Sequence, residues 1–326
     1  MTKTLIIACG VADTRAALLD GETVLRFWLG PARGDEAADD YPILGRRYAG
    51  RIARADAALG RAFVDIGTAA QGFLPQPKKG ERLVEGALIE VEVKTEPRRK
   101  KGPVLRVSNL APSGAATGPL AGEDAAVMAA RALGGDDAAI IVDDPGGKRA
   151  LEAAGFATVS ADNGTGCLWR RHGLDGELAA ALNRRVPLQG GGALTIDETE
   201  ALTAIDVDTG ALESASQKRA REKIARAAMK EAMRQIALRN IGGHIVIDFP
   251  PQQNAAEQKA FEESVRAAAK EIGGSAASFS KSGLFSFRRP RAAASLLDRL
   301  TEEDEPRRSA GGGSRHRRRR STPSAR

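Results

Sequence analysis

The sequence predicts an α+β protein of several domains, in which a strand-and-helix scaffold is interrupted by a small β-barrel and followed by an α/β unit. Short apolar runs separated by Gly, Pro and charged turns occupy residues 48–110, which is typical of a Greek-key barrel. Helical and strand patterns alternate over 123–155. A long amphipathic helix over 216–240 lies between two apolar strands that each end in aspartate.

The composition is that of a folded protein without a membrane segment. The chain has 326 residues, of which 42% are hydrophobic and 28% charged, so it can form two or three units with their own cores. No apolar run approaches the length of a membrane span and no basic-then-apolar leader follows Met1, so we expect a cytoplasmic protein. Cys9 and Cys167 are far apart and lack a CxxC partner, so neither a disulfide framework nor a cysteine zinc site is expected.

The positive charge is concentrated at the C-terminal end. The formal net charge is +7, and the eight arginines from Arg307 to Arg326 account for more than this whole excess. The rest of the chain is therefore not basic. Residues 301–326 are polar and rich in Gly and Ser, which predicts a disordered basic tail. Such a tail suits non-specific contact with RNA phosphates, and a solvated terminus without a specific role is the alternative.

The elements before residue 194 follow from local patterns. Residues 2–10 and 14–29 read as strands, with Asp20-Gly21 as a hairpin turn. After the barrel, a Pro/Gly/Ala-rich connector over 111–122 leads into a short helix over 123–133. A strand at 138–144, a helix at 147–156 closed by Gly155, and a helix at 174–182 complete this part of the chain.

The elements after residue 194 form the α/β unit. The basic helix over 216–240 is followed by a strand over 242–250, which is stopped by Pro250-Pro251. The next helix carries Phe261, Val265, Ala268 and Ile272 on one face. The stretch 276–287 predicts a last strand or strand pair.

Three aspartates form a candidate cation site. Residues i and i+2 of a strand share a face, so Asp206 and Asp208 point to the same side. Asp248 ends a second apolar strand, where an unpaired carboxylate is costly unless it is paired or metal-bound. Oxygen ligands favour Mg²⁺ or Mn²⁺ over zinc. The alternative is that the acids accept strand-end or helix N-terminal hydrogen bonds, or pair with arginines on the neighbouring helix.

The segment "GGALTIDETEALTAIDVDTG", followed by a basic helix and "RNIGGHIVIDFP", resembles the catalytic core of the RNase E/G endoribonucleases. The resemblance implies that Asp206 and Asp248 hold a catalytic Mg²⁺, with Mn²⁺ as an alternative and no zinc. Asp208 stands where the family usually has Asn, which helps to orient a ligand or the attacking water. The implied reaction is hydrolysis of single-stranded RNA, leaving 5′-phosphate and 3′-hydroxyl ends.

The resemblance also covers the barrel. The stretches "AFVDIG" and "GFLP" resemble an S1-type OB-fold, which implies that Phe63 and Phe73 stack on RNA bases; barrel core is the alternative for both. In "EPRRKKGP", residues Arg98 to Lys101 form a cationic cluster on an expected hairpin loop, which could bind the phosphate backbone. Lys101 best matches a lysine of the family, and a solvated turn is the alternative for the other three. Lys281, in "SFSKSGLF", corresponds to a basic residue that neutralises phosphate charge; an exposed surface lysine is the alternative.

The resemblance implies a division of the chain into known units. The expected domains are an RNase H-like scaffold in two parts (1–47 and 136–193), an S1-type OB-fold RNA-binding domain (48–112), a connector in place of a 5′-sensor (113–135), a DNase I-like catalytic subdomain (194–300) and the tail (301–326). No motif like "RTAG" and no CPxCxG zinc-link occur, so 5′-end sensing and a zinc-linked tetramer are not expected. The oligomeric state is left open.

Two functions are compatible with these observations. The first is a Mg²⁺-dependent endoribonuclease that acts on single-stranded RNA. The second is an RNA-binding accessory protein of the same fold with little or no cleavage activity. The presence of both Asp206 and Asp248 favours the enzyme, whereas the missing sensor and dimerisation segments keep the second function open.

Overall fold

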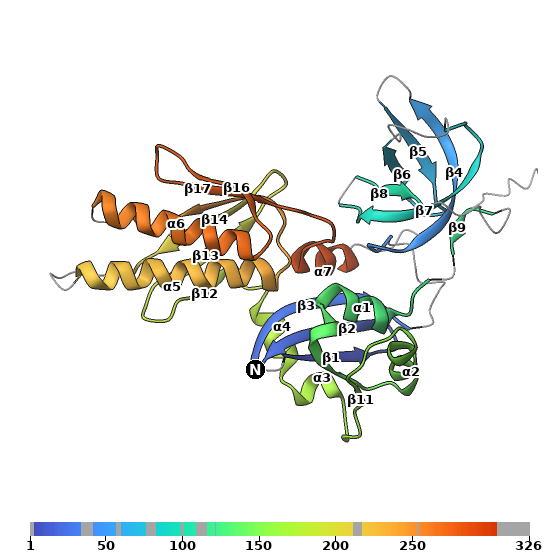
Figure 1. The fold of residues 1–326 in the computed structure, drawn as a ribbon, viewed down its shortest axis with the longest axis horizontal. Coiled ribbons are helices and arrows are strands. Elements are labelled where there is room, and N and C mark those ends of the chain that lie inside the picture. Colours follow the sequence, from blue (N-terminus) through green and yellow to red (C-terminus); the bar gives the residue numbers. More distant parts are fainter. Residues whose placement is uncertain are drawn as a thin grey trace, which may run out of the picture.

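The computed structural model consists of two sheets and a barrel (Figure 1). It describes residues 3–33, 42–56, 60–75, 83–98, 101–108, 116–120, 122–210, 217–252 and 254–304. The basic tail beyond residue 304, Arg99, Lys100 and part of the connector lie outside the described residues. The expected α+β architecture with a small barrel is confirmed.

The first sheet is mixed and has the strand order β11-β10-β1-β2-β3. Its strands are β1 (Lys3–Cys9), β2 (Asp13–Asp20), β3 (Thr23–Pro31), β10 (Ala138–Val142) and β11 (Val159–Ala161). Because β10 pairs in parallel with β1, the chain returns to its first strand after the barrel. Alternate residues of β1 are buried on opposite faces: Leu5 and Ile7 pack on one side, and Ile6 and Ala8 on the other.

Helices cover both faces of this sheet. They are α1 (Ala125–Leu133), α2 (Pro145–Ala153), α3 (Leu168–Arg171) and α4 (Leu174–Ala180), with a 3₁₀ turn η1 (Gly135–Asp137). Asp124 and Asp144 cap the first two helices by accepting hydrogen bonds from backbone N–H groups of the first turn. Because helices cover both of its faces, this sheet serves as a structural scaffold.

The barrel contains five strands, β4 to β8, and β4 closes it by pairing with both β5 and β7. Their bounds are β4 (Arg47–Asp56), β5 (Arg61–Asp65), β6 (Gly72–Pro75), β7 (Leu88–Thr95) and β8 (Val104–Val107), and the short β9 (Gly118–Pro119) adds to β4. The interior is filled by Tyr48, Ile52, Ala62, Val64, Ile66, Leu74, Val91, Val93 and Leu105. Gly72 permits this packing, since a Cβ there would lie 2.3 Å from Leu105.

The third unit is a six-stranded sheet in the order β12-β13-β14-β15-β17-β16. The strands are β12 (Arg185–Pro187), β13 (Ala193–Glu198), β14 (Thr203–Asp208), β15 (Gly243–Asp248), β16 (Ser275–Phe279) and β17 (Phe285–Arg289). The helices α5 (Gln217–Leu238) and α6 (Ala255–Glu271) bury one face, against residues such as Ile205, Ile245 and Ile247. No helix in the described part of the chain is long and apolar enough to cross a membrane.

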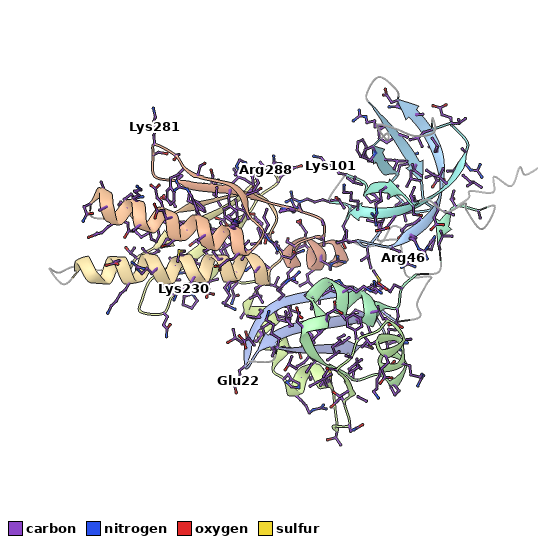
Figure 2. All side chains as sticks on the ribbon, in the orientation of Figure 1. Glu22, Arg46, Lys101, Lys230, Lys281 and Arg288 are labelled. Atoms are coloured by element: carbon purple, nitrogen blue, oxygen red, sulfur yellow. The ribbon has the colours of Figure 1, made fainter. Side chains whose placement is uncertain are left out.

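The other face of this sheet is exposed, and we call it the open face. Successive residues of β14 and β15 alternate between buried and accessible: Ala204 and Asp206 are exposed on β14, and His244 and Asp248 on β15. Arg288 of β17 is exposed as well and projects from this unit in Figure 2. The period of two places these side chains on the face away from α5 and α6.

The helix α7 (Leu296–Asp304) lies where the three units meet (Figure 1). It extends past residue 300, where the sequence predicted the folded part to end. Leu296 is buried in the cluster that covers one face of the first sheet. The chain just before it, from Ala292, accepts a 2.8 Å hydrogen bond from the backbone of Glu96, which follows β7.

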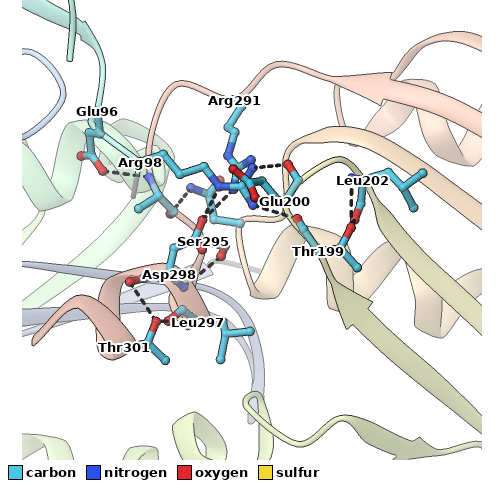
Figure 3. Close-up of polar contacts among 12 residues, drawn as sticks. Glu96, Arg98, Thr199, Glu200, Leu202, Arg291, Ser295, Leu297, Asp298 and Thr301 are labelled. Atoms are coloured by element: carbon cyan, nitrogen blue, oxygen red, sulfur yellow. Dashed lines mark hydrogen bonds and ion pairs between the residues drawn. The ribbon is translucent and has the colours of Figure 1, made fainter. Parts of the chain in front are cut away.

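A polar network attaches the barrel to this region (Figure 3). Glu96 is 6% exposed, and its carboxylate accepts hydrogen bonds from the backbone N–H groups of Leu44 and Ala294 and from the Arg299 guanidinium. The buried charge is therefore paired and hydrogen-bonded, as burial requires.

Arg98 is the second anchor of the barrel (Figure 3). Its Nε donates to Asp298 at 3.0 Å, and its terminal nitrogens donate to the carbonyls of Thr199 and Glu200 at 3.0 and 3.1 Å. The Asp298 carboxylate also accepts from Arg291 at 2.6 Å. Arg98 was predicted as part of a solvated or phosphate-binding loop, but it joins the barrel to α7 and to the β13–β14 turn.

The Arg98–Asp298 contact makes a testable contribution to stability. We expect Arg98→Ala and Asp298→Ala each to lower the free energy of unfolding by about 1–3 kcal/mol, because each change removes a charged hydrogen-bond partner from a partly buried charge. In a double-mutant cycle by urea denaturation, the coupling energy should be about 0.5–3 kcal/mol. The control is Arg106→Ala, which breaks an exposed pair with Glu92 and should cost no more than about 1 kcal/mol. Additive effects of the two substitutions would contradict the anchor.

Candidate functional site

Asp206 and Asp248 lie directly beside each other at the ends of two neighbouring strands. The strands β14 and β15 are parallel, and their register pairs Ile205 with Ile247 and Asp206 with Asp248. Neighbouring strands are about 4.8 Å apart, so both carboxylates are within reach of one small ion. Ile205 and Ile247 are 2% and 0% exposed on the helix side, which places both aspartates on the open face.

Neither carboxylate has a protein partner among the residues that the structure describes. No hydrogen bond or ion pair joins the side chain of Asp206 or Asp248 to another residue within the described ranges, so none of the described arginines pairs with either acid. No group of three or more His, Cys, Asp or Glu residues within the described ranges is arranged to hold a metal. Two adjacent free carboxylates fit Mg²⁺, which is often bound by one or two carboxylates together with water and substrate phosphates.

Asp208 differs from the other two acids. Its Oδ2 accepts a 2.7 Å hydrogen bond from Arg185 on β12, and its Oδ1 accepts one from the backbone N–H of Gly210 at 2.9 Å. These contacts, the Gly210 N–H first and Arg185 second, lower the pKa of the Asp208 carboxyl. Asp208 therefore realises the alternative of a strand-end acid paired with an arginine, although that arginine lies on a strand and not on the helix.

Lys281 lies in the turn between β16 and β17 and is exposed. Since β17 runs antiparallel to β15 with Phe285 opposite Ile247, this turn is at the same end of the sheet as Asp248. Figure 2 shows Lys281 at the tip of the hairpin. The lysine is at the correct edge for a role near the carboxylate pair, and that role stays a prediction.

Phe63 and Phe73 lie on the outer surface of the barrel. They are opposite each other on β5 and β6, and their rings pack edge to face with centroids 6.4 Å apart. Their neighbours Ala62, Val64 and Leu74 point inward and belong to the core, whereas both phenylalanines are half-buried. The alternative of barrel core does not describe these two residues.

Arginines surround the two rings. The guanidinium of Arg54 lies 5.1 Å from the Phe63 ring centroid, and that of Arg61 lies 5.7 and 5.8 Å from the Phe63 and Phe73 centroids. We call these four residues the aromatic patch. Flat rings beside cations offer a stacking surface for bases and a charge for phosphates.

Lys101 is exposed and lies close to the boundary between the barrel and the six-stranded sheet. It forms an antiparallel bridge with Arg98, which confirms the expected hairpin. Because Arg98 is bound to the β13–β14 turn, this hairpin is held beside the six-stranded sheet. Figure 2 places Lys101 on the side of the barrel that faces that sheet.

Two exposed side chains of the open face were missed in the sequence. His244 and Arg288 are direct neighbours across β15 and β17. The signal was present, since the period of two puts His244 on the face of Asp248, and puts Arg288 on the face opposite the buried Phe285 and Phe287.

The middle and C-terminal part of the chain is similar to known ribonucleases. Residues 146–292 match the sequence profile of the Ribonuclease E/G family. The chain is 33% identical to Ribonuclease G of Escherichia coli (strain K12) over 135 residues, which are 40% of this chain and 27% of that protein. It is also 33% identical to a "Ribonuclease E/G-like protein, chloroplastic" of Arabidopsis thaliana over 134 residues, 40% of this chain and 13% of that protein.

A third relative is Ribonuclease E of Buchnera aphidicola subsp. Schizaphis graminum, with 33% identity over 136 residues, 40% of this chain and 14% of that protein. The chain thus spans well under half the length of these relatives. The matched family segment includes Asp206, Asp248 and Lys281 but leaves out the barrel with Phe63, Phe73 and Lys101.

The Arg185–Asp208 pair predicts a pH-dependent effect. The folded-state pKa of Asp208 is depressed below the unfolded value of about 3.9, so the pair stabilises the fold above that pH, and this stability is lost as the pH falls through the folded-state pKa. We expect Arg185→Gln to raise the Asp208 pKa in an NMR titration, and to destabilise the protein at pH 7 but not at pH 2.

The matched control is Arg184→Gln, which removes the hydrogen bond that lowers the pKa of Asp197. Each substitution should move the titration of its own partner and leave the other aspartate unchanged. An Asp208 titration that does not respond to Arg185→Gln would show that the salt bridge is absent in solution.

Proposed function

Because residues 146–292 match the Ribonuclease E/G family, we propose that this chain is a Mg²⁺-dependent endoribonuclease of that family that cleaves single-stranded RNA. The observation that carries the proposal is the register of β14 and β15, which sets Asp206 and Asp248 side by side, exposed and without protein partners among the described residues. Both aspartates lie inside the segment that matches the family.

In this proposal the three units have distinct roles. The five-stranded sheet, in the order β11-β10-β1-β2-β3, is an RNase H-like scaffold, and the closed barrel is an S1-type OB-fold that binds RNA. The six-stranded sheet with α5 and α6 is the DNase I-like catalytic subdomain. The strand orders and the closed barrel are compatible with these names.

The chemistry takes place on the open face. Asp206 and Asp248 would hold Mg²⁺, or Mn²⁺ in its place, from the sheet side, which leaves the solvent side free for a phosphate. When bound, the ion stabilises charge on the phosphate and activates water for in-line attack. Asp208, fixed by Arg185 and two residues further along the strand, would orient the attacking water. Water adds its hydroxyl to phosphorus and its proton goes to the departing O3′, which gives 5′-phosphate and 3′-hydroxyl ends.

The barrel supplies the contacts to the substrate. Phe63 and Phe73 would stack on unpaired bases, and such stacking does not depend on the nucleotide sequence. The guanidinium groups of Arg54 and Arg61 lie beside the rings. Lys101 would contact a phosphate on the way from the barrel to the six-stranded sheet, and Lys281 would contact one at the carboxylate end. This arrangement suits single strands, because paired bases do not expose their faces.

The carboxylate pair is tested by substitution and by metal removal. We expect Asp206→Asn and Asp248→Asn each to lower the cleavage rate of labelled single-stranded RNA by at least about 100-fold, because each removes a charge that holds the ion. EDTA should abolish cleavage, and added Mg²⁺ should restore it. The control is Asp197→Asn, which changes an acid of the same sheet face that is bound to Arg184 and should leave the rate within about threefold.

The outcome separates the enzyme from the accessory RNA-binding protein. Cleavage that persists in both variants would place the active site elsewhere. Binding of RNA without cleavage by the unaltered protein, with Mg²⁺ or Mn²⁺ present, would favour the RNA-binding accessory function.

The aromatic patch is tested by binding. Base stacking on an aromatic side chain contributes about 1–3 kcal/mol per base, so Phe63→Ala and Phe73→Ala should each weaken binding of a single-stranded oligonucleotide by roughly 5- to 150-fold. The melting temperature should fall little, because both rings lie outside the barrel core. The matched control is Leu74→Ala, which empties a core position and should lower the melting temperature strongly. Unfolding of the barrel in the phenylalanine variants would assign the rings to stability instead.

A further inference from the structure

We propose that Arg288, with His244 beside it, binds an RNA phosphate on the open face and guides the strand from the barrel to the carboxylate pair. The inference rests on the proposed ribonuclease function and assigns a positioning role to two residues of the same sheet. Three observations support it: the register of the strands, the ion pairs that other arginines of the sheet form, and the attachment of the barrel to one end of the sheet.

The register places the side chains of Arg288 and His244 and the two carboxylates on one surface. His244 pairs with Arg288, and four residues further along β15 lies Asp248, paired with Asp206. The residues on the other face, Phe285 and Phe287, are 0% and 1% exposed beneath the helices. Arg288 therefore projects from the same face as the carboxylates, at a distance of about 13 Å along the strand.

Two arginines at the β12 edge of this sheet are already paired. Arg184 binds Asp197, and Arg185 binds Asp208. By contrast, the side chains of Arg288 and His244 have no hydrogen bond or ion pair with any described residue. The next residue, Arg289, is half-buried and donates to the carbonyls of Ile272 and Ile241 at 2.9 and 2.7 Å. Of these two consecutive arginines, one serves the fold and the other is free to bind a ligand.

The chemistry of the free side chain favours a phosphate. A guanidinium presents a rigid fork of donors that matches phosphate oxygens, and it stays charged at every pH of interest. The neighbouring imidazole adds one further donor. A protein carboxylate is the alternative partner, but Asp206 and Asp248, the open-face carboxylates without a described partner, are at the other end of the strands.

The barrel is attached at the Arg288 end of the sheet. Arg98 donates to Thr199 and Glu200 in the β13–β14 turn, and Thr203 at the start of β14 pairs with Ile245, the neighbour of His244. The same hairpin carries Lys101, which faces this side in Figure 2. An RNA strand that leaves the barrel at Lys101 therefore passes Arg288 and His244 before it reaches Asp206 and Asp248.

The experiment measures the salt dependence of RNA binding by fluorescence anisotropy, with a single-stranded oligonucleotide in EDTA. One phosphate contact to a single strand contributes about 0.7 to the slope of log K against log salt concentration. We expect Arg288→Gln to reduce this slope by about 0.7 and to weaken binding at low salt, and Arg288→Lys to restore the slope. The control is Arg226→Gln on the solvent side of α5, which removes the same charge from a pair with Glu222 and should leave the slope unchanged.

The results distinguish this inference from the proposed function. If the unaltered protein cleaves RNA and Arg288→Gln binds with the same slope, the phosphate contact is refuted while the ribonuclease stands. If the protein does not cleave but Arg288→Gln lowers the slope, the contact stands and the enzyme does not. If the unaltered protein binds no RNA, both are overturned.

Discussion

The parallel pairing of β14 with β15 is the constraint on which the candidate site depends. It brings Asp206 and Asp248 together only because Ile205 and Ile247, one residue earlier on each strand, are buried under α5 and α6. A shift of either strand by one residue would turn an aspartate into that core and an isoleucine into water, at a cost of several kcal/mol. The hydrophobic packing of the helices thus sets the distance between two carboxylates that touch no other described side chain.

The position of the barrel is likewise set by its contacts with the other units, but these contacts are polar. An OB-like barrel on a flexible attachment would bind RNA without aiming it. Here Glu96 and Arg98 follow β7 directly and attach to the chain around α7 and to the β13–β14 turn. Loss of one partner of a buried charged pair is destabilising, so these contacts resist separation of the barrel from the other units. These contacts fix the position of the aromatic patch relative to the open face. In the proposed function, one RNA strand would contact both surfaces.

The sequence was informative wherever neighbours along the chain decide the structure. The period of two identified the faces of β14 and β15, and the spacing of apolar runs predicted the barrel. It was silent on contacts between distant residues. Arg185 reaches Asp208 across the intervening strand β13, and Arg98 meets Asp298 two hundred residues later, and neither pair leaves a local pattern. Phe63 was ambiguous because β5 has apolar residues on both faces, so that only the closed barrel shows which face is inside.

In the proposed function, the arrangement of charge also explains how a folded part without a basic excess would bind RNA. The eight arginines after residue 306 exceed the whole net charge of +7, so attraction by the folded part has to come from local placement. Arg288, which has no partner among the described residues, lies at the barrel side of the open face, whereas Asp206 and Asp248 would repel a phosphate until a divalent cation neutralised them. If both bind as proposed, metal and RNA would favour each other's binding by the same factor, since coupling between two ligands is reciprocal. The RNA strand would bind at the barrel side with or without the ion, and it would reach the carboxylate pair only when the ion is bound.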